Sequence, residues 1–411
     1  MEERLPNRML FPLLGIGINL CLGNLYAWSV FRTPLMKAHG WTAAEATFPF
    51  QLSIAFFAVA MVFAGRWQDK AGPRTVGMVG GVLFGVGFVL SSMIGHTLMG
   101  LYLAYGLITG VAMGCAYVTP LAVTIKWWPD KRGLMTGLVV MGFGAGAIIG
   151  GIGGPLMIDA FGVSTTFLIF GIAFGSVVTL CASMLRNPPP GYKPAGWSPP
   201  APAPGAAVAK ADYSPGEMVK TPQFYFLWIP YFIGSAVGLT LISQASPIGQ
   251  EMAGLSPVVA GGAVTLLAVF NGLGRPGFGW ISDLVGRKNA VILDFAILMV
   301  AMLLILPNAS TFAMYALAVC MVGFGFGGFL ALMPAFTADF FGTKNLGLNY
   351  GLVFSAWGFA GLFGPILGLQ VRAATGGWLN AFYIYAALCV LGIICIALAK
   401  APTAKEAPAK A

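Results

Sequence analysis

The sequence predicts an all-α membrane protein with twelve transmembrane helices in two pseudo-symmetric six-helix bundles. Three observations support this: an apolar composition, twelve apolar runs of about 20 residues, which is the length of a membrane-spanning helix, and an internal repeat. Of the 411 residues, 58% are hydrophobic and 9% are charged, whereas soluble domains carry about 25% charged residues. The runs cover residues 10–31, 44–64, 75–95, 98–124, 133–157, 163–185, 223–243, 256–280, 289–307, 311–336, 346–370 and 377–399.

The two halves of the sequence resemble each other at a constant offset of 214 residues. The loop sequence GRWQDKAGPR, which begins at Gly65, returns as GWISDLVGRK from Gly279. The runs 137–150 and 351–364 also share glycines at matching positions. An unchanged offset in separated blocks indicates that a unit of six spans was duplicated. Many secondary transporters are built from such repeats, with the substrate site near the membrane midplane.

The repeat and the changes in composition divide the chain into four parts. These are an N-terminal bundle (1–186), a cytoplasmic linker (187–222), a C-terminal bundle (223–399) and a disordered cytoplasmic tail (400–411). The linker is too polar and too rich in proline to span a membrane. No cleavable signal peptide is expected, because charged residues lead directly into a full-length first span.

The net charge of +9 indicates membrane orientation rather than binding to nucleic acid. Cations gather in the loops on one side of the predicted spans, and only Arg32, Lys37 and Arg372 fall on the other side. The positive-inside rule then predicts that both termini are cytoplasmic, in a plasma membrane that would be the inner membrane of a bacterium. The cations of the short inner loops are Arg66, Lys70, Arg74, Lys126, Lys131, Arg132, Arg287, Lys288 and Lys344.

One arginine lies inside an apolar run, where a fixed charge is costly. Arg275 belongs to the run AVTLLAVFNGLGRPGFGW, and an arginine at the centre of a membrane helix costs roughly 2.5 to 3.5 kcal/mol. Its planar guanidinium matches a carboxylate, so we expect a transporter of a small anion with Arg275 as the counter-charge. Asn271 shares its helix face and would contact the same substrate. The alternative is that Arg275 extends to the cytoplasmic surface.

No catalytic, metal or nucleotide site is expected. The six cysteines all lie in predicted spans without metal-ligand spacing. Glycines repeated every four residues, such as Gly77, Gly81 and Gly85, favour close packing of helices over a phosphate loop, because no strand precedes them. The sequence therefore predicts a protein that is not an enzyme, with no cofactor, no metal and no nucleic-acid partner.

The loop pattern that begins at Gly65 and returns at Gly279 resembles the signature of the major facilitator superfamily. The resemblance extends over essentially the whole chain, given the twelve spans, the duplication and the central linker. In that family the pattern forms a cytoplasmic gate, in which the aspartate pairs with basic residues and with a neighbouring helix end. The resemblance therefore implies gate residues here, and the alternative is ordinary loop charges. These residues are Asp69, Arg74, Asp283 and Arg287.

Two further stretches resemble the group that contains the oxalate:formate antiporters and the monocarboxylate transporters. They are WWPDKRGLMTG at 127–137 and NGLGRPGFG at 271–279. The second resembles the part of span eight whose arginine binds the substrate carboxylate, which implies that role for Arg275. The resemblance also implies that Tyr117 and Tyr26 line the pocket. Packing in a helix interface is the alternative for each tyrosine.

Two departures from these families bear on substrate and coupling. The oxalate carriers have a second cation in span eleven, where this chain has Trp357. A single cation matches a monoanion better than a dianion, and Trp357 either lines the pocket or packs in the core. The animal monocarboxylate carriers have an aspartate in place of Asn271, so the proton-coupling residue is open. Asp294, a carboxylate well inside a span, is the candidate, or it pairs with a loop cation near Lys288.

We therefore expect a secondary transporter that moves small monocarboxylates, such as L-lactate or pyruvate, together with protons by alternating access. Its partners would be the small carboxylate, the proton and membrane lipid, and it would function as a monomer. The alternative is a carboxylate exchanger of the oxalate:formate type. A membrane sensor or scaffold would require an appended soluble domain, which the short linker and tail do not supply.

Overall fold

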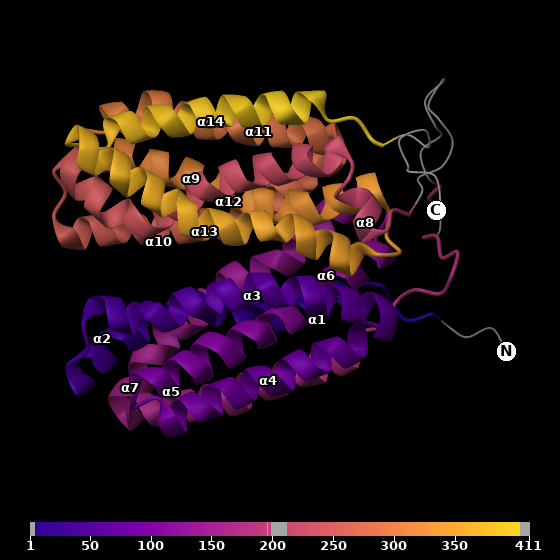
Figure 1. Ribbon diagram of the computed structural model, residues 1–411, viewed down its shortest axis with the longest axis horizontal. Coiled ribbons are helices and arrows are strands. Elements are labelled where there is room, and N and C mark those ends of the chain that lie inside the picture. The colour runs from indigo at the N-terminus through magenta and orange to yellow at the C-terminus, as the bar shows by residue number, and fades with distance from the viewer. Residues whose placement is uncertain (1–4, 195, 199–211, 403–411) are drawn as a thin grey trace. The chain divides into compact units, whose positions relative to one another are not determined.

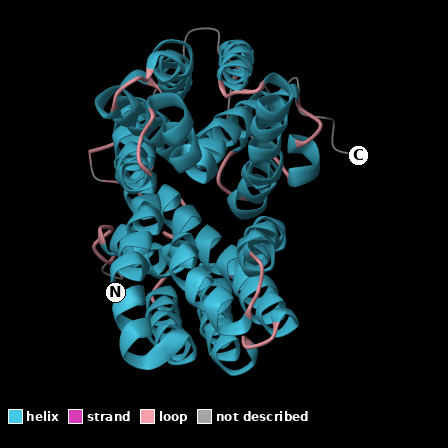
Figure 2. Cartoon of the chain, turned by 90° about the vertical axis from the view of Figure 1, so that its left-hand side faces the viewer, coloured by secondary structure: helices cyan, strands magenta, loops and turns pink. Residues whose placement is uncertain are grey.

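The computed structural model describes residues 5–194, 196–198 and 212–402, and these residues form helices and loops without a β-strand (Figure 1 and Figure 2). Within this part of the chain, ten helices are long and apolar enough to cross a membrane. The predicted all-α membrane fold is confirmed. Parts of the predicted linker and tail, at 195, 199–211 and 403–411, lie outside the described residues.

The helices follow the predicted spans closely, and each is named here with its bounds. The first half contains α1 (Leu10–Leu22), η1 (Gly23–Ala27), α2 (Trp28–His39), α3 (Ala43–Ala71), α4 (Pro73–Ile94), α5 (Leu98–Leu101), η2 (Tyr102–Thr109), α6 (Gly110–Trp127) and α7 (Arg132–Ser183). The second half contains α8 (Pro215–Met218), α9 (Pro222–Ala253), α10 (Pro257–Val285), α11 (Arg287–Val300), η3 (Ala301–Ile305), η4 (Leu306–Asn308), α12 (Phe312–Phe341), α13 (Leu346–Thr375) and α14 (Leu379–Leu398).

Two of these helices account for the difference between the ten candidate spans and the twelve predicted from the sequence. α7 has 52 residues and would extend roughly 78 Å at 1.5 Å per residue, more than twice the hydrocarbon thickness of about 30 Å. It holds two spans that meet at Gly162, where φ is +78°. α10 is not among the ten candidate spans, but its 29 residues extend roughly 44 Å, which is enough to cross.

The backbone repeats between the halves as the sequence does. Gly72 directly follows α3 and Gly286 directly follows α10, and both glycines have φ +85°. Residues with a side chain rarely adopt positive φ, so glycine permits the sharp change of direction at both places. In each half the next helix then begins at once, α4 at Pro73 and α11 at Arg287. The duplicated loop pattern is therefore a duplicated helix–turn–helix geometry.

The chain forms two compact units. The first contains Met1–Asp130, Leu138–Pro199 and Thr343–Gly351, and the second contains Lys131–Gly137, Pro200–Gly342 and Leu352–Ala411. Each unit thus includes a short segment from the other half of the sequence. For the first unit this segment contains the start of α13, and for the second it contains the start of α7.

In the first unit, α1 and η1 pack against α7 through glycines. Gly23 lies against the backbone of Phe143, and Gly146 lies against the Leu20 carbonyl and the Gly23 backbone. A Cβ atom at Gly23 or Gly146 would overlap these backbone atoms. The close approach of the helices therefore depends on the missing side chains, as it does in other membrane-helix pairs.

We expect Gly146→Ala to destabilise the first unit by about 1–3 kcal/mol, because the added methyl group overpacks the contact between α7 and α1. Gly151→Ala is the matched control, since Gly151 lies on the same helix with no atom within 4 Å of its Cβ position. The measurement is the thermal unfolding midpoint of the purified protein in detergent. Equal midpoints for the two variants would contradict this account of the packing.

Candidate functional site

Arg275 lies in the interior of the second unit rather than at an aqueous surface. Its side chain is on α10 and is 1% exposed. Nε and Nη2 both donate to Oδ1 of Asn271, at 3.1 and 3.0 Å. The spacing of four residues places both side chains on one helix face, as the sequence predicted. The burial of Arg275 rules out its extension to the cytoplasmic surface.

Backbone contacts with α12 fix the part of α10 that carries this pair. Gly274 lies against the Phe324 carbonyl, and Gly327 lies against the Asn271 carbonyl and the Arg275 amide nitrogen. α10 remains helical through this region. A Cβ at either glycine would overlap a carbonyl of the neighbouring helix, so the glycines allow the close approach that orients Asn271 and Arg275.

Trp357 is buried in the same unit, within an aromatic group. It lies on α13 and is 1% exposed. Its ring stacks on Phe354 with a centroid distance of 5.1 Å and an interplanar angle of 24°. Phe354 in turn lies 6.3 Å from Tyr231 of α9. Trp357 is therefore held by aromatic neighbours from its own helix and, through Phe354, from α9.

The two tyrosines predicted for the pocket belong to one aromatic cluster of the first unit. Tyr26 of η1 meets Phe143 of α7 edge-on at 5.1 Å. Tyr117 of α6 lies 5.2 Å from Phe57 of α3 and 5.7 Å from Phe143. We call Tyr26, Phe57, Tyr117 and Phe143 the aromatic cluster. Phe57 and Phe143 were not predicted, because nothing in the sequence distinguishes them among the 31 phenylalanines.

Asp294 is completely buried in the second unit, at 0% exposure. Among the described residues neither carboxylate oxygen has a hydrogen-bond partner. The oxygens face Gly325 and Gly328 of α12, where an added Cβ would overlap them. Lys288 donates to the Ala397 carbonyl instead, so the alternative pairing of Asp294 with this cation is not formed.

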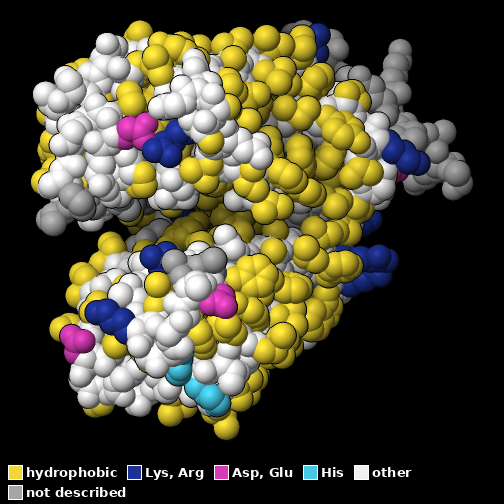
Figure 3. Space-filling model, turned by 60° about the vertical axis from the view of Figure 1, so that its left-hand side comes forward, with side chains coloured by type: hydrophobic (Ala, Val, Ile, Leu, Met, Phe, Trp, Pro, Cys, Tyr) yellow, Lys and Arg dark blue, Asp and Glu magenta, His cyan; other side chains and the backbone are white. Residues whose placement is uncertain are grey.

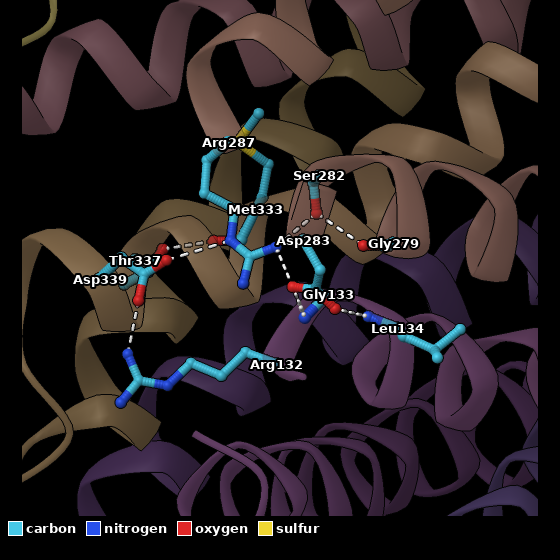
Figure 4. Close-up of polar contacts among 10 residues, drawn as sticks. All are labelled: Arg132, Gly133, Leu134, Gly279, Ser282, Asp283, Arg287, Met333, Thr337 and Asp339. Atoms are coloured by element: carbon cyan, nitrogen blue, oxygen red, sulfur yellow. Dashed lines mark hydrogen bonds and ion pairs between the residues drawn. The ribbon is translucent and has the colours of Figure 1, made fainter. Parts of the chain in front are cut away.

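The loop aspartate of the second unit holds the start of a helix. Asp283 accepts hydrogen bonds from the backbone N–H groups of Gly133 at 3.0 Å and Leu134 at 2.8 Å, in the first turn of α7 (Figure 4). These N–H groups have no partner within their own helix, and the helix dipole favours a negative charge there. Arg287 Nη1 also donates to Asp283 at 2.6 Å.

A second carboxylate extends this clamp into a charged network. Asp339 of α12 accepts from Arg132 at 2.5 Å and from Nε of Arg287 at 3.0 Å (Figure 4). We call Arg132, Asp283, Arg287 and Asp339 the charged network. Asp339 was not predicted from the sequence, and Arg132 was predicted only as an orientation charge. The available signal was a lone carboxylate at the inner end of a span, among loops rich in cations.

The first unit contains the corresponding clamp without such a network. Asp69 accepts from the backbone N–H groups of Gly347 at 3.0 Å and Leu348 at 2.9 Å, at the start of α13. Arg74, predicted to act with Asp69, is exposed and forms no ion pair among the residues that the structure describes. The helix end therefore satisfies Asp69 without help from Arg74.

Comparison with known proteins places this geometry in a family. Residues 13–307 and 250–411 match the model of the Major Facilitator Superfamily. The chain is 31% identical over 404 residues to the oxalate:formate antiporter of Oxalobacter formigenes, which covers 96% of this chain and 91% of that protein. It is 27% identical over 342 residues to monocarboxylate transporter 12 of Xenopus laevis, with 79% and 73% covered.

The fold agrees with that of solved transporters. The crystal structure of FucP, a Major Facilitator Superfamily transporter, in the outward conformation matches with a TM-score of 0.71 at 16% identity, over 95% of this chain and 98% of that chain. The resemblance inferred from the loop and span motifs is confirmed.

We expect Asp339→Asn to lower the stability of the second unit, because Arg132 and Arg287 then lose the charge that they share. Asp339 is 27% exposed, so solvent screening limits the loss to about 1 kcal/mol. The measurement is the thermal unfolding midpoint at low and high salt, since salt weakens such pairs. Asp159→Asn, at an exposed residue of α7, is the control. An unchanged midpoint for Asp339→Asn would contradict a stabilising network.

Proposed function

We propose that this chain, which belongs to the Major Facilitator Superfamily, carries small monocarboxylates such as L-lactate or pyruvate together with protons by alternating access. The family consists of transporters, so the chain is a multi-pass membrane transporter and not an enzyme. It is related to a protein named as an oxalate:formate antiporter and to one named as a monocarboxylate transporter. The observation that carries the proposal is the buried guanidinium of Arg275.

The guanidinium of Arg275 has the charge and the geometry to bind a carboxylate. A guanidinium has five N–H donors and does not lose its proton. Asn271 accepts hydrogen bonds from Nε and Nη2, and its amide adds no negative charge beside the guanidinium. A substrate carboxylate beside the guanidinium would form charge-assisted, paired hydrogen bonds with it. We therefore assign Arg275 to the substrate carboxylate and Asn271 to the same site.

The remaining site residues favour a small monoanion with an organic part. Trp357 provides an aromatic surface where the oxalate carriers have a second cation, so the charge of a dianion would be only half balanced. In the first unit, Tyr26 and Tyr117 are the proposed substrate contacts, and their hydroxyl groups suit the hydroxyl or carbonyl of lactate or pyruvate. The rings of the aromatic cluster would exclude larger polar solutes.

Proton coupling requires a group whose protonation changes the energy of the protein. Asp294 is the proposed group, because an ionised carboxylate without a partner costs several kcal/mol in such surroundings. Proton exchange at Asp294 would therefore alter the packing of α11 against α12, where Gly325 and Gly328 contact its oxygens. Protonation of Asp294 and binding of the substrate would then be coupled through the packing of the second unit, without direct contact between the proton and the substrate.

The two helix-start clamps are the proposed gate. Asp69 holds the start of α13 and Asp283 holds the start of α7, and a transport cycle would release and re-form these bonds. Arg287 would stabilise the closed clamp through Asp283. Arg74 has no contact that supports a part in this step. The proposed working form is a monomer, and the distribution of loop cations supports a cytoplasmic position for both termini.

The second candidate function is exchange of one carboxylate for another. It is favoured by the 31% identity to the oxalate:formate antiporter over 96% of this chain. Preloading proteoliposomes with unlabelled anion distinguishes the two, because an exchanger needs an internal partner whereas a symporter does not. Faster uptake only after preloading would establish exchange. Uptake into empty vesicles, driven by an inward proton gradient, would establish symport.

We expect Arg275→Gln to reduce saturable uptake of radiolabelled L-lactate by proteoliposomes about 30-fold or more, because a buried charged partner of the anion is lost. Arg275→Lys should retain part of the uptake, since the charge remains but the paired geometry does not. Arg372→Gln, which removes a cation paired with Glu251, is the control for a general loss of charge. Undiminished uptake by Arg275→Gln, with equal reconstitution of all variants, would refute the site.

Asn271→Asp should make substrate binding depend on pH at this position. The introduced carboxylate would pair with Arg275 and cancel its charge, so each bound anion would have to be accompanied by a proton. Linkage then predicts an affinity that rises up to tenfold for each unit of pH decrease, beyond any wild-type dependence. Asn271→Leu should weaken binding without this added slope. The measurement is the apparent Kd for lactate between pH 5 and 8, and identical slopes in both variants would contradict the assignment.

A further inference from the structure

The first unit carries an apolar groove between two membrane-spanning helices. The groove has a volume of about 360 Å³ and lies between α3 and α6. Phe63 and Val59 on its wall are 71% and 56% exposed, and hydrophobic side chains cover much of the face that Figure 3 shows. The residues that line the groove and are used here are Phe56, Val59, Phe63, Trp67, Val111 and Cys115.

The length of the groove corresponds to one leaflet of the bilayer. Its residues on α3 extend from Phe56 to Trp67, a rise of roughly 17 Å at 1.5 Å per residue. The hydrocarbon core is about 30 Å thick, so a groove of this length accommodates the acyl chain of one lipid. It does not cross the membrane.

One end of the groove is cationic. Lys70 follows Trp67 by three residues and Phe63 by seven, which places it on the same face of α3 as the groove. Arg66 flanks the same turn, and both cations are exposed. Trp67 is 40% exposed, and its indole N–H makes no hydrogen bond with the described residues. Two cations and a free N–H donor therefore lie where the groove reaches the membrane interface.

We propose that this groove binds an anionic phospholipid of the leaflet in which Arg66 and Lys70 lie. One acyl chain lies along α3 and α6, and the phosphate contacts Lys70, Arg66 and the Trp67 indole. An acyl chain gains little by moving from lipid to an apolar protein surface, so selection depends on the head group. By the positive-inside rule this leaflet is the cytoplasmic one, where basic residues attract anionic lipids.

A second groove of the same unit lacks the cationic end that would select a lipid head group. It lies between α4 and α7 and is larger, about 590 Å³. Its lining includes Gly81, Gly85, Gly171 and Gly175 but no lysine or arginine. This second groove would accept any acyl chain. The charge at the end of the α3–α6 groove is thus the feature that assigns a lipid class.

A second copy of the chain is a less suitable occupant of the α3–α6 groove. A two-fold interface places the same surface of both copies together. Pairing along α3 would bring Lys70 and Arg66 of one copy near those of the other, without a carboxylate from the groove to separate them. The like charges would repel, whereas a phosphate attracts both.

The test is native mass spectrometry of the full-length protein in detergent, titrated with phosphatidylglycerol or phosphatidylcholine. The wild type should bind phosphatidylglycerol selectively. The double variant Arg66→Gln/Lys70→Gln should bind it about 25-fold more weakly, at about fivefold for each cation. Lys220→Gln removes another exposed cation and should bind within about twofold of the wild type. An unchanged affinity in the double variant would overturn the proposal.

A second variant tests the groove itself. Val111→Phe narrows the α3–α6 groove without altering any charge. This variant should lower the affinity for phosphatidylglycerol while leaving Arg66 and Lys70 in place. Glycerol 3-phosphate, which lacks acyl chains, should fail to compete, because a phosphate alone lacks the groove contact. Effective competition by it would overturn the lipid assignment in favour of a soluble phosphate. A dimer whose formation depends on Phe63 would overturn it in favour of a second copy.

Discussion

Hydrocarbon offers no hydrogen bonds, so every polar group at membrane depth must find its partner within the protein. This constraint explains why the described residues form helices, whose backbone bonds are internal. It also explains why a buried polar side chain takes a partner from its own helix where it can, as Arg275 does with Asn271. Where a partner is missing among the described residues, as at Asp294, the buried side chain lowers stability. A functional role is then the physical reason to expect for its presence.

Most of the fold could be predicted because spans are long, apolar and repeated, and these properties survive in the sequence. The contact between Asp283 and the start of a neighbouring helix could be predicted from the duplicated loop pattern. Asp339 could not, because its contact with Arg132 arises only when α12 packs beside the start of α7. Phe143 is a similar case, since its place beside Tyr26 depends on how closely the glycines let α7 approach η1.

The duplication gives the two clamps the same geometry but unequal strength. Both aspartates accept two backbone hydrogen bonds from a helix start, yet only Asp283 also meets an arginine. The position that corresponds to Arg287 in the first half is Pro73, which begins α4 without a charge or a donor. Asp69 is therefore held by the helix start and by the charge of Lys126 rather than by an arginine. The bond from Arg287 adds to the two backbone bonds at Asp283, so the repeat of the backbone does not imply a repeat of the energetics.

The partner of Arg275 determines what kind of anion site the second unit can hold. An aspartate four residues before the arginine would satisfy both N–H donors and also cancel the charge, and a substrate carboxylate would then compete with it. Asn271 offers the same acceptor atom at 3.0 and 3.1 Å without the negative charge. The amide oxygen thus holds the guanidinium in one orientation and adds no negative charge beside it. The amide oxygen of Asn271 sets the orientation of the guanidinium, and the guanidinium itself supplies the positive charge. Orientation and charge at this site therefore come from different side chains.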